Sequence, residues 1–217
     1  MNKINTISIN SDHPDDAVLA RAADVLRRSG VIVHATATVY GLAAVWNDPA
    51  ALEKVSRLKG RPAGQPYSIM VPAIAAVADF TGWDHPALQA LLAAVFPGAI
   101  TLVLPRRRPL TPAYWNQFPE VGIRMPDHRI SRQLVAQSGV ALITTSANIS
   151  GQPTPADAAG LDPAIAAGAD LVLDSGPCQF QVPSTVVRVD VERRQYQILR
   201  PGAFPPERFA ALFEALG

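Results

Sequence analysis

Helix-like and strand-like segments alternate along most of this chain, and this alternation restricts the fold more than any other feature of the sequence. The first predicted helix has Asp12 or His13 before it, Pro14 at its first position and Gly30 at its end. Further helices are predicted at 49–59, from Asp84-His85-Pro86, after Asp127 and from about Pro206. Apolar, mostly β-branched runs predict strands at 31–33, 68–71, 100–104, 121–125, 141–144, 171–173, 185–189 and 196–199.

This order of segments is typical of an α/β protein. The last two predicted strands flank a polar turn, so they are expected to form an antiparallel hairpin within a mixed sheet. The chain of 217 residues shows no linker and no internal repeat, and it is long enough to bury a substantial core. We therefore expect a single domain over residues 1–217, in which helices flank a twisted mixed β-sheet.

Composition excludes several classes of protein and of site. The net charge of +1 provides no overall field that would hold the chain on nucleic acid or on an anionic membrane. The single cysteine, Cys178, excludes an internal disulfide and a multi-cysteine metal site, and the four histidines lack metal-ligand spacing. No apolar run approaches 18 residues and the N-terminus lacks a signal core, so we expect a cytoplasmic protein without membrane contact and without a metal site.

Two polar runs point to a binding site. Lys59 and Arg61 stand at the end of a predicted helix, and the run TTSANISG at 144–151 directly follows a buried strand. Together they offer positive charge, short hydrogen-bond donors and glycine, which suit a polyanionic nucleotide. Taken alone, the cations are also typical of a solvated helix end, and Ser146 and Asn148 of ordinary turn residues. Their place beyond a strand end favours a site, because ligands of open α/β sheets bind in that crevice.

Other polar residues interrupt apolar segments. Arg124 lies inside an apolar strand, where a guanidinium needs an anion, and we expect an anionic ligand there. Thr38 and Tyr40 follow the first strand, although Tyr40 is as readily a structural residue. His34 is predicted to be structural, and the arginines at 106–108 are more typical of a solvated loop than of an RNA contact. No nucleophile with a paired base is evident, so the chemistry expected is positioning and charge neutralisation.

Seven motifs occur in the order found in the YrdC-like family, which the chain resembles over nearly its whole length. They are TVYGL at 38–42, KGRP at 59–62, PGAIT at 97–101, VGIRMP at 121–126, TSANISG at 145–151, PSTVV at 183–187 and LRPG at 199–202. The resemblance implies the mixed α/β fold of that family in its short, single-domain form. It also implies a nucleotidyltransferase that makes threonylcarbamoyl-AMP and pyrophosphate from L-threonine, bicarbonate and ATP.

The same resemblance implies roles for individual residues. Lys59, Arg61, Ser146 and Asn148 would form the catalytic tetrad. ATP would be held by Lys59, Arg61, Gln65, Asn148 and Arg200, and threonine with its carbamate by Thr38, Arg124, Ser146 and Ser184. Mg²⁺ would arrive with ATP instead of occupying a protein cage. The product would pass to the tRNA threonylcarbamoyl transfer machinery, for modification of a tRNA adenosine.

The sequence departs from the family pattern in the loop after the first strand. Ala35 and Ala37 stand where proline and an acid are usual, so a charge beside the expected threonine pocket is missing. Gln65 and Met70 also differ from the residues frequent in the family. Two alternatives therefore stay open: a paralogue that acts on another substrate, and a non-catalytic module that binds RNA through the same basic surface.

Overall fold

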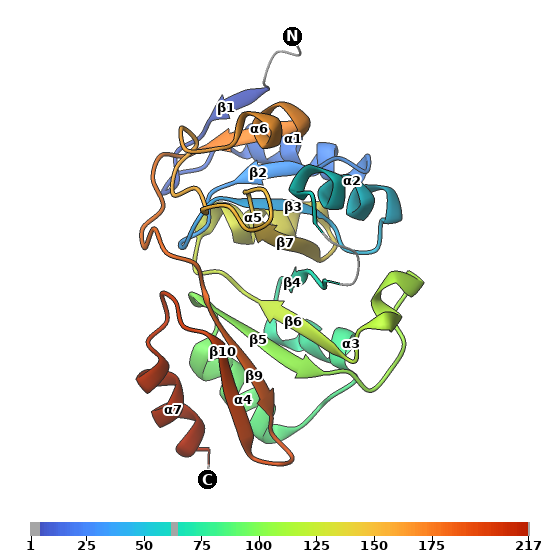
Figure 1. The fold of residues 1–217 in the computed structure, drawn as a ribbon, viewed down its shortest axis with the longest axis vertical. Helices are drawn as coiled ribbons and strands as arrows, with labels where there is room; N and C mark the ends of the chain where they lie inside the picture. Colours follow the sequence, from blue (N-terminus) through green and yellow to red (C-terminus); the bar gives the residue numbers. More distant parts are fainter. Residues whose placement is uncertain (1–4, 62–64, 217) are drawn as a thin grey trace.

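A single mixed β-sheet organises the molecule, as the sequence predicts. The computed structural model describes residues 5–61 and 65–216, and in these the strands follow the order β1-β8-β2-β3-β7-β4-β6-β5-β9-β10 (Figure 1). The strand bounds are β1 (Thr6–Ser8), β2 (Ile32–His34), β3 (Gly41–Val45), β4 (Ser68–Met70), β5 (Ile100–Pro105), β6 (Glu120–Arg124), β7 (Leu142–Ser146), β8 (Leu171–Asp174), β9 (Thr185–Asp190) and β10 (Gln195–Arg200).

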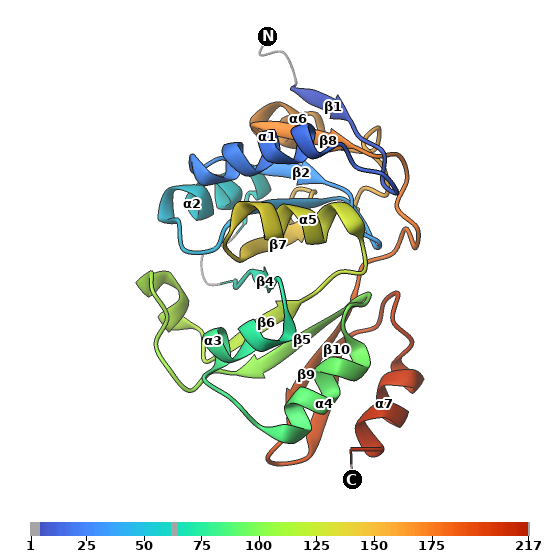
Figure 2. The ribbon, with the colours of Figure 1, turned by 180° about the vertical axis from the view of Figure 1, so that it is seen from behind.

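The helices cover the two parts of the sheet differently. The helix bounds are α1 (Asp16–Arg27), α2 (Pro49–Lys59), α3 (Val77–Thr81), α4 (Pro86–Val95), α5 (Arg129–Ser138), α6 (Pro163–Gly168) and α7 (Pro206–Glu214), with 3-10 turns η1 (Ile74–Ala76) and η2 (Ala113–Gln117). Over the first half-sheet (β1, β8, β2, β3 and β7), α1 and α5 lie on one face and α2 and α6 on the other. On the second half-sheet (β4, β6, β5, β9 and β10), α3 and α4 cover only the face seen in Figure 2.

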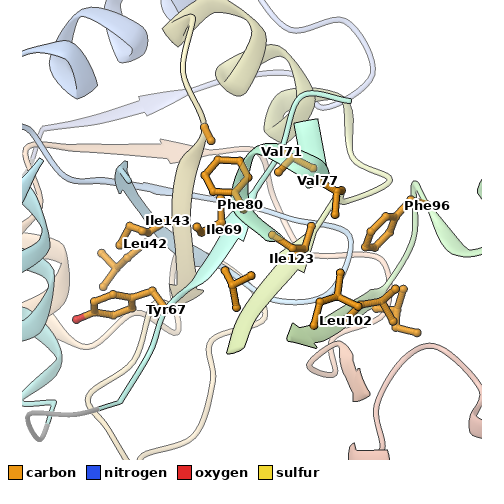
Figure 3. Packing of buried hydrophobic residues seen from close by; sticks show 14 of the residues in the cluster. Leu42, Tyr67, Ile69, Val71, Val77, Phe80, Phe96, Leu102, Ile123 and Ile143 are labelled. Carbon is orange, nitrogen blue, oxygen red and sulfur yellow. The ribbon is translucent and has the colours of Figure 1, made fainter. Parts of the chain in front are cut away.

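The short strand β4 joins the two half-sheets. It pairs antiparallel with β7 and parallel with β6, so the hydrogen-bonded ladder continues across the molecule. Ile69, Ile123 and Ile143 come from these three strands and are fully buried beside one another in the main core (Figure 3). A smaller core lies between α1, α5 and the first half-sheet. The buried apolar core is therefore continuous across β4, and this packing fixes the two half-sheets relative to each other.

Two helix starts differ from the sequence prediction. Helix α1 begins at Asp16 and not at Pro14, because the Asn10 side chain accepts from the backbone N–H groups of Asp12 and His13 and holds them in a turn. Asp15 then caps the helix. Helix α5 begins at Arg129, after His128, so Asp127 is not its cap. The predicted start of α2 is confirmed: Asp48 accepts from two backbone N–H groups and Pro49 stands in the first turn.

Several elements are absent from the prediction. Strand β3, with the sequence GLAAV, is almost fully buried between β2 and β7. Its glycine and alanines have low strand propensity, so only its partners make it a strand. Helices α3 and α6 and both 3-10 turns were also not predicted, because six or fewer residues show too little helical periodicity, and strand β1 was missed as well. None of the described helices has the length and apolar character needed to cross a membrane.

Candidate functional site

A pocket of about 470 Å³ lies where the two half-sheets meet, on the face that α3 and α4 leave open. Its charged lining residues, among those described, are four arginines and one carboxylate: Arg61, Arg124, Arg188, Arg200 and Glu120. Residues that carry hydroxyl groups also line it from both half-sheets: Thr36, Thr38, Tyr40, Tyr67, Ser68, Thr101, Thr144, Thr145, Ser146 and Ser184. The excess of positive charge suits a ligand with several negative charges.

Arg124 is a buried cation that lacks an anion. It ends β6, it is 8% exposed, and among the described residues no carboxylate forms an ion pair with it. One Nη donates to Thr38 Oγ1 at 3.3 Å, while the buried Nε has no acceptor. Burial and the neighbouring Arg200 lower the pKa of Arg124 to about 10. Because a buried guanidinium without an anion is costly, this geometry favours an anionic group of a ligand in the pocket.

The loop after β2 delivers threonine hydroxyls to Arg124. Thr36 Oγ1 accepts from the backbone N–H groups of Thr38 and Val39, and it lies 2.8 Å from Thr38 Oγ1. These local bonds fix the turn and aim the Thr38 hydroxyl toward the pocket. Ala37, between the two threonines, is 4% exposed and does not line the pocket. Its carbonyl accepts from the Phe180 backbone N–H at 2.9 Å, so the backbone at this departure from the family pattern is held against the loop that contains Phe180.

Ser184 and Arg200 also line the pocket, and Arg200 lies near enough to Arg124 to influence its pKa. The Arg200 guanidinium donates through Nε and Nη2 to the Ser184 carbonyl at 3.2 and 2.8 Å. Ser184 Oγ lies 3.2 Å from Thr101 Oγ1. This arrangement requires glycine at 202, since a Cβ there would stand 2.3 Å from the Pro183 carbonyl oxygen. The predicted pair from the PSTVV and LRPG motifs is therefore brought together at one end of the pocket.

Arg61 enters the pocket from the opposite side. Its guanidinium lies over the Tyr67 ring at 4.6 Å, and its Nη groups donate to Thr145 Oγ1 at 3.3 Å and to the Pro66 carbonyl at 2.7 Å. Burial lowers its pKa, and its Nε has no acceptor. Arg61 thus resembles Arg124 in lacking a carboxylate partner among the described residues. Pro62 and Gly64, predicted in the loop that follows, lie outside the described residues.

Lys59 and Asn148 lie behind the pocket wall and do not line it. The Lys59 ammonium is 4% exposed and donates to the carbonyls of Ser146 and Asn148 at 2.6 and 2.8 Å, and to Asn148 Oδ1 at 3.3 Å. Asn148 Nδ2 donates to the Ile149 and Gln152 carbonyls. Burial, with Arg61 nearby, lowers the Lys59 pKa to about 8. Both side chains hold the loop after β7 in place.

Ser146 connects this buried network to the pocket. It ends β7 and lines the pocket, while its hydroxyl donates to Asn148 Oδ1 at 2.5 Å. Gln65 differs from the other predicted residues: it is exposed and does not line the pocket, although its carbonyl accepts from the Tyr114 hydroxyl at 3.3 Å. Six of the nine predicted residues therefore line the pocket, Lys59 and Asn148 lie behind its wall, and Gln65 lies outside the lining.

The other residues of interest are engaged elsewhere. His34 is fully buried, with Nδ1 2.8 Å from the Ala35 carbonyl, and burial lowers its pKa to about 4. The Tyr40 hydroxyl donates to the Gly176 carbonyl at 2.8 Å. The three arginines at 106–108 contact their own chain: Arg106 binds the carbonyls of the η2 turn, Arg107 pairs with Glu192, and Arg108 contacts Asp79. None of the three supports an RNA contact by itself.

Sequence reasoning missed Glu120 and Arg188. Both line the pocket, and they form an ion pair at 2.8 Å between Arg188 Nε and Glu120 Oε1. The available signal was strand alternation. Glu120 lies four residues before Arg124 on β6, and Arg188 on β9 lies four residues after Ser184, which directly precedes that strand. Residues an even number apart share one face of a strand, so each belongs to the face of a predicted site residue.

Comparison with known proteins agrees with this architecture. The sequence profile of the Sua5/YciO/YrdC family, described as "Telomere recombination", matches residues 24–202. The chain belongs to this family. Its identity to the threonylcarbamoyl-AMP synthase of Bacillus subtilis (strain 168) is 35% over 205 residues, which cover 91% of this chain and 57% of that protein. Identity to a putative threonylcarbamoyl-AMP synthase of Methanocaldococcus jannaschii is 27% over 209 residues, covering 96% and 97%.

Solved structures of Sua5/YciO/YrdC proteins share the fold. The structure of Sua5 from Pyrococcus abyssi complexed with L-threonine has a TM-score of 0.85 and 27% identity, covering 95% of this chain and 60% of that one. Escherichia coli YciO, at 22% identity, has a TM-score of 0.81 and is covered over its full length. The chain spans 57% and 54% of the length of the Bacillus and Pyrococcus relatives. The predicted family and fold are confirmed.

Proposed function

We propose that this protein is an L-threonylcarbamoyladenylate synthase, a nucleotidyltransferase that makes threonylcarbamoyl-AMP and pyrophosphate from L-threonine, bicarbonate and ATP. The observation that carries the proposal is Arg124, a buried guanidinium without an anion that faces a pocket lined by arginines and hydroxyl groups. A relative named threonylcarbamoyl-AMP synthase at 35% identity, and a related Sua5 structure that contains L-threonine, supply the chemical identity of the ligand.

The pocket residues divide between the two substrates. Arg124, Thr38 and Ser184 lie together and suit the carboxylate and hydroxyl of threonine, or its carbamate. Arg61, with Thr145 and Ser146 beside it, suits the phosphates of ATP. In this proposal Arg200, which also lines the pocket, serves the space between the threonine set and the phosphate set. In the reaction a carbamate oxygen bonds to the α-phosphorus, and the bond from that phosphorus to the pyrophosphate oxygen breaks. Negative charge grows on the leaving pyrophosphate, where fixed guanidinium groups stabilise it.

Lys59 and Asn148 serve this chemistry indirectly in our proposal. They fix the backbone of residues 146–150, so that Thr145 and Ser146 present their hydroxyls at the pocket surface. A wall that does not move when the substrate binds needs no reorganisation during reaction.

Mg²⁺ belongs to the proposal as the partner of ATP. Among the described residues, no group of three or more His, Cys, Asp or Glu side chains is arranged to hold a metal ion. The ion would therefore arrive coordinated by the phosphates, whose charge it reduces. The use of ATP and a tRNA-directed product support a cytoplasmic location, which is part of the proposal. The product, a mixed anhydride that water hydrolyses, would pass to the tRNA threonylcarbamoyl transfer machinery.

The decisive experiment follows pyrophosphate release from Mg-ATP with and without L-threonine and bicarbonate, and identifies the product by mass. Release that needs both, together with the mass of threonylcarbamoyl-AMP, is expected. Arg124→Ala should raise the KM for threonine at least about tenfold, because it removes a charge-assisted hydrogen bond, while the KM for ATP changes less than about threefold. Arg57→Ala, which removes an exposed ion pair with Glu53, is the control. Release without threonine, or with another amine in its place, would overturn the proposal in favour of a paralogue.

A further inference from the structure

Glu120 is the one carboxylate among the described residues that line the pocket. It begins β6, and its two carboxylate oxygens lie 2.8 and 3.1 Å from Nε of Arg188 on β9. Arg188 also donates through Nη1 to Gln197 Oε1 at 3.2 Å. The charge of Arg188 is thus balanced within the pocket, whereas Arg61 and Arg124 have no carboxylate partner among the described residues. The pocket therefore has strongly cationic parts and one part that is close to neutral.

An apolar floor adjoins this neutral part. Val103 on β5 pairs with Gly122 on β6 and with Arg188 on β9, so the three residues form one row across neighbouring strands. The row is flat at Gly122, because glycine has no side chain. A Cβ at this position would stand 3.0 Å from Ser68 Oγ. Phe118 and Pro119, directly before Glu120, add apolar lining. This part of the pocket consequently offers a flat, mostly apolar surface with one carboxylate at its edge.

ATP has two chemically different halves that match this division. Its triphosphate is repelled by a carboxylate and attracted by guanidinium groups that have no counter-ion. Its nucleoside is uncharged, has a flat aromatic base, and carries neutral donors in the ribose hydroxyls and the base amino group. A carboxylate is an acceptor for such donors, as in dinucleotide-binding folds where an acid binds ribose hydroxyls.

We propose that Glu120, oriented by Arg188, binds the nucleoside half of ATP by accepting a hydrogen bond from a ribose hydroxyl or from the base amino group. The base lies on the floor formed by Gly122, Val103 and Val186, and the triphosphate extends toward Arg61. This assignment rests on the proposed function, in which ATP is the nucleotide. It makes Glu120 a specificity residue for the nucleotide and leaves threonine binding to the Arg124 end of the pocket.

Calorimetric titrations test the assignment without relying on turnover. Wild-type protein and Glu120→Ala are titrated with ATP, 2′-deoxy-ATP, 3′-deoxy-ATP and purine riboside triphosphate, which lacks the amino group. The variant should bind ATP at least about tenfold more weakly, the usual effect of losing a hydrogen bond to a charged group. For the one analogue that lacks the donor to Glu120, wild type and variant should bind equally, within about twofold. That analogue identifies the partner group.

Controls separate this role from a structural one. Glu53→Ala removes an exposed ion pair with Arg57 outside the pocket and should leave every affinity unchanged. In pyrophosphate-release assays, Glu120→Ala should raise the KM for ATP and leave the KM for threonine unaltered. Equal weakening of all four nucleotides, or unchanged or tighter ATP binding, would overturn the role of Glu120 alone. Failure of the wild-type protein to bind ATP would overturn the proposed function and this assignment together.

Discussion

Lys59 and Arg124 are both buried cations, yet their surroundings give them opposite roles. The Lys59 ammonium has three protein oxygens within 3.3 Å, so its donors are occupied without any ligand. Arg124 contacts one hydroxyl and keeps a buried Nε without an acceptor. A buried charge is costly unless polar or oppositely charged groups contact it. For Lys59 these groups are the oxygens of the loop after β7, and for Arg124 we propose that the ligand supplies an anionic group.

This contrast predicts different consequences for two neighbouring substitutions. Lys59→Ala leaves the Ser146 and Asn148 carbonyls without their buried donor and should destabilise the fold by about 2–3 kcal/mol, or roughly 5–10 °C in melting temperature. Arg61→Ala removes a partly exposed side chain that faces the pocket. It should change the melting temperature by less than about 2 °C and raise the KM for ATP about tenfold. Thermal melts and pyrophosphate-release kinetics measure both.

Arg57→Ala, two residues before Lys59 in the last turn of α2, controls for loss of a cation near the helix end. A Lys59→Ala protein as stable as wild type, with only its ATP affinity reduced, would place Lys59 in the ligand-binding set and contradict the structural role.

The sequence indicates both cations but not their directions. Lys59 and Arg61 stand two residues apart, and a motif does not show which way each side chain points. Gly60, with φ of 53°, ends α2 in the left-handed conformation and turns the chain between them. Lys59 therefore reaches beneath the loop while Arg61 enters the pocket. The same limit applies to Asn148, whose amide is used entirely by neighbouring backbone and side-chain groups.

At the scale of elements, most strands were predicted from their apolar runs, but β1 and β3 were not. The run Val31-Ile32-Val33 and the segment 185–189 are strands within a residue or two of the predicted bounds. Strand β3 was missed because its residues are small, and its place between β2 and β7 is a tertiary effect. Its absence from the prediction also hid how Thr38, before β3, and Ser146, which pairs with Gly41 on β3, come to line one pocket.

The packing of β2 against α5 predicts acid sensitivity. His34 on β2 lies 3.5 Å from Ser131 Oγ on α5, and Ser131 Oγ lies 3.3 Å from His128 Nδ1. Burial lowers the pKa of both imidazoles from 6.5 to about 4. As pH falls from about 6.5 to 4, the unfolded chain therefore binds protons that the folded protein does not, and stability decreases. His34 alone should cost about 2 kcal/mol between pH 7 and pH 5.

Urea unfolding at pH 7 and pH 5 measures this loss, and His34→Gln should reduce it. Because that variant removes a core side chain, NMR titration of the imidazoles in the wild-type protein provides an independent measurement. An imidazole of His34 that titrates near 6.5 in the folded protein would contradict the prediction.

At the scale of the whole molecule, the pocket joins the two half-sheets. Thr38, Thr145 and Ser146 belong to the first half-sheet or the loop after β2, whereas Arg124, Ser184 and Arg200 belong to the second. Only the three-residue strand β4 completes the ladder between β7 and β6. A ligand that binds both sets of residues therefore adds contacts across the short strand that joins the two half-sheets. Binding should stabilise the two halves as a unit.

Melting experiments with both ligands test this coupling. ATP and L-threonine, each at about 100 times its Kd, should each raise stability by about 2.7 kcal/mol, which corresponds to roughly 5–10 °C for a chain of this size. In Arg124→Ala, at the same ligand concentrations, the increment from threonine should fall to about half or less and the increment from ATP should persist, since the two ligands occupy different ends of the pocket. Hydrogen exchange should slow most in β4, because its opening separates the half-sheets. Exchange that slows only in α1 and α5, far from the pocket, would show that the ligands bind elsewhere.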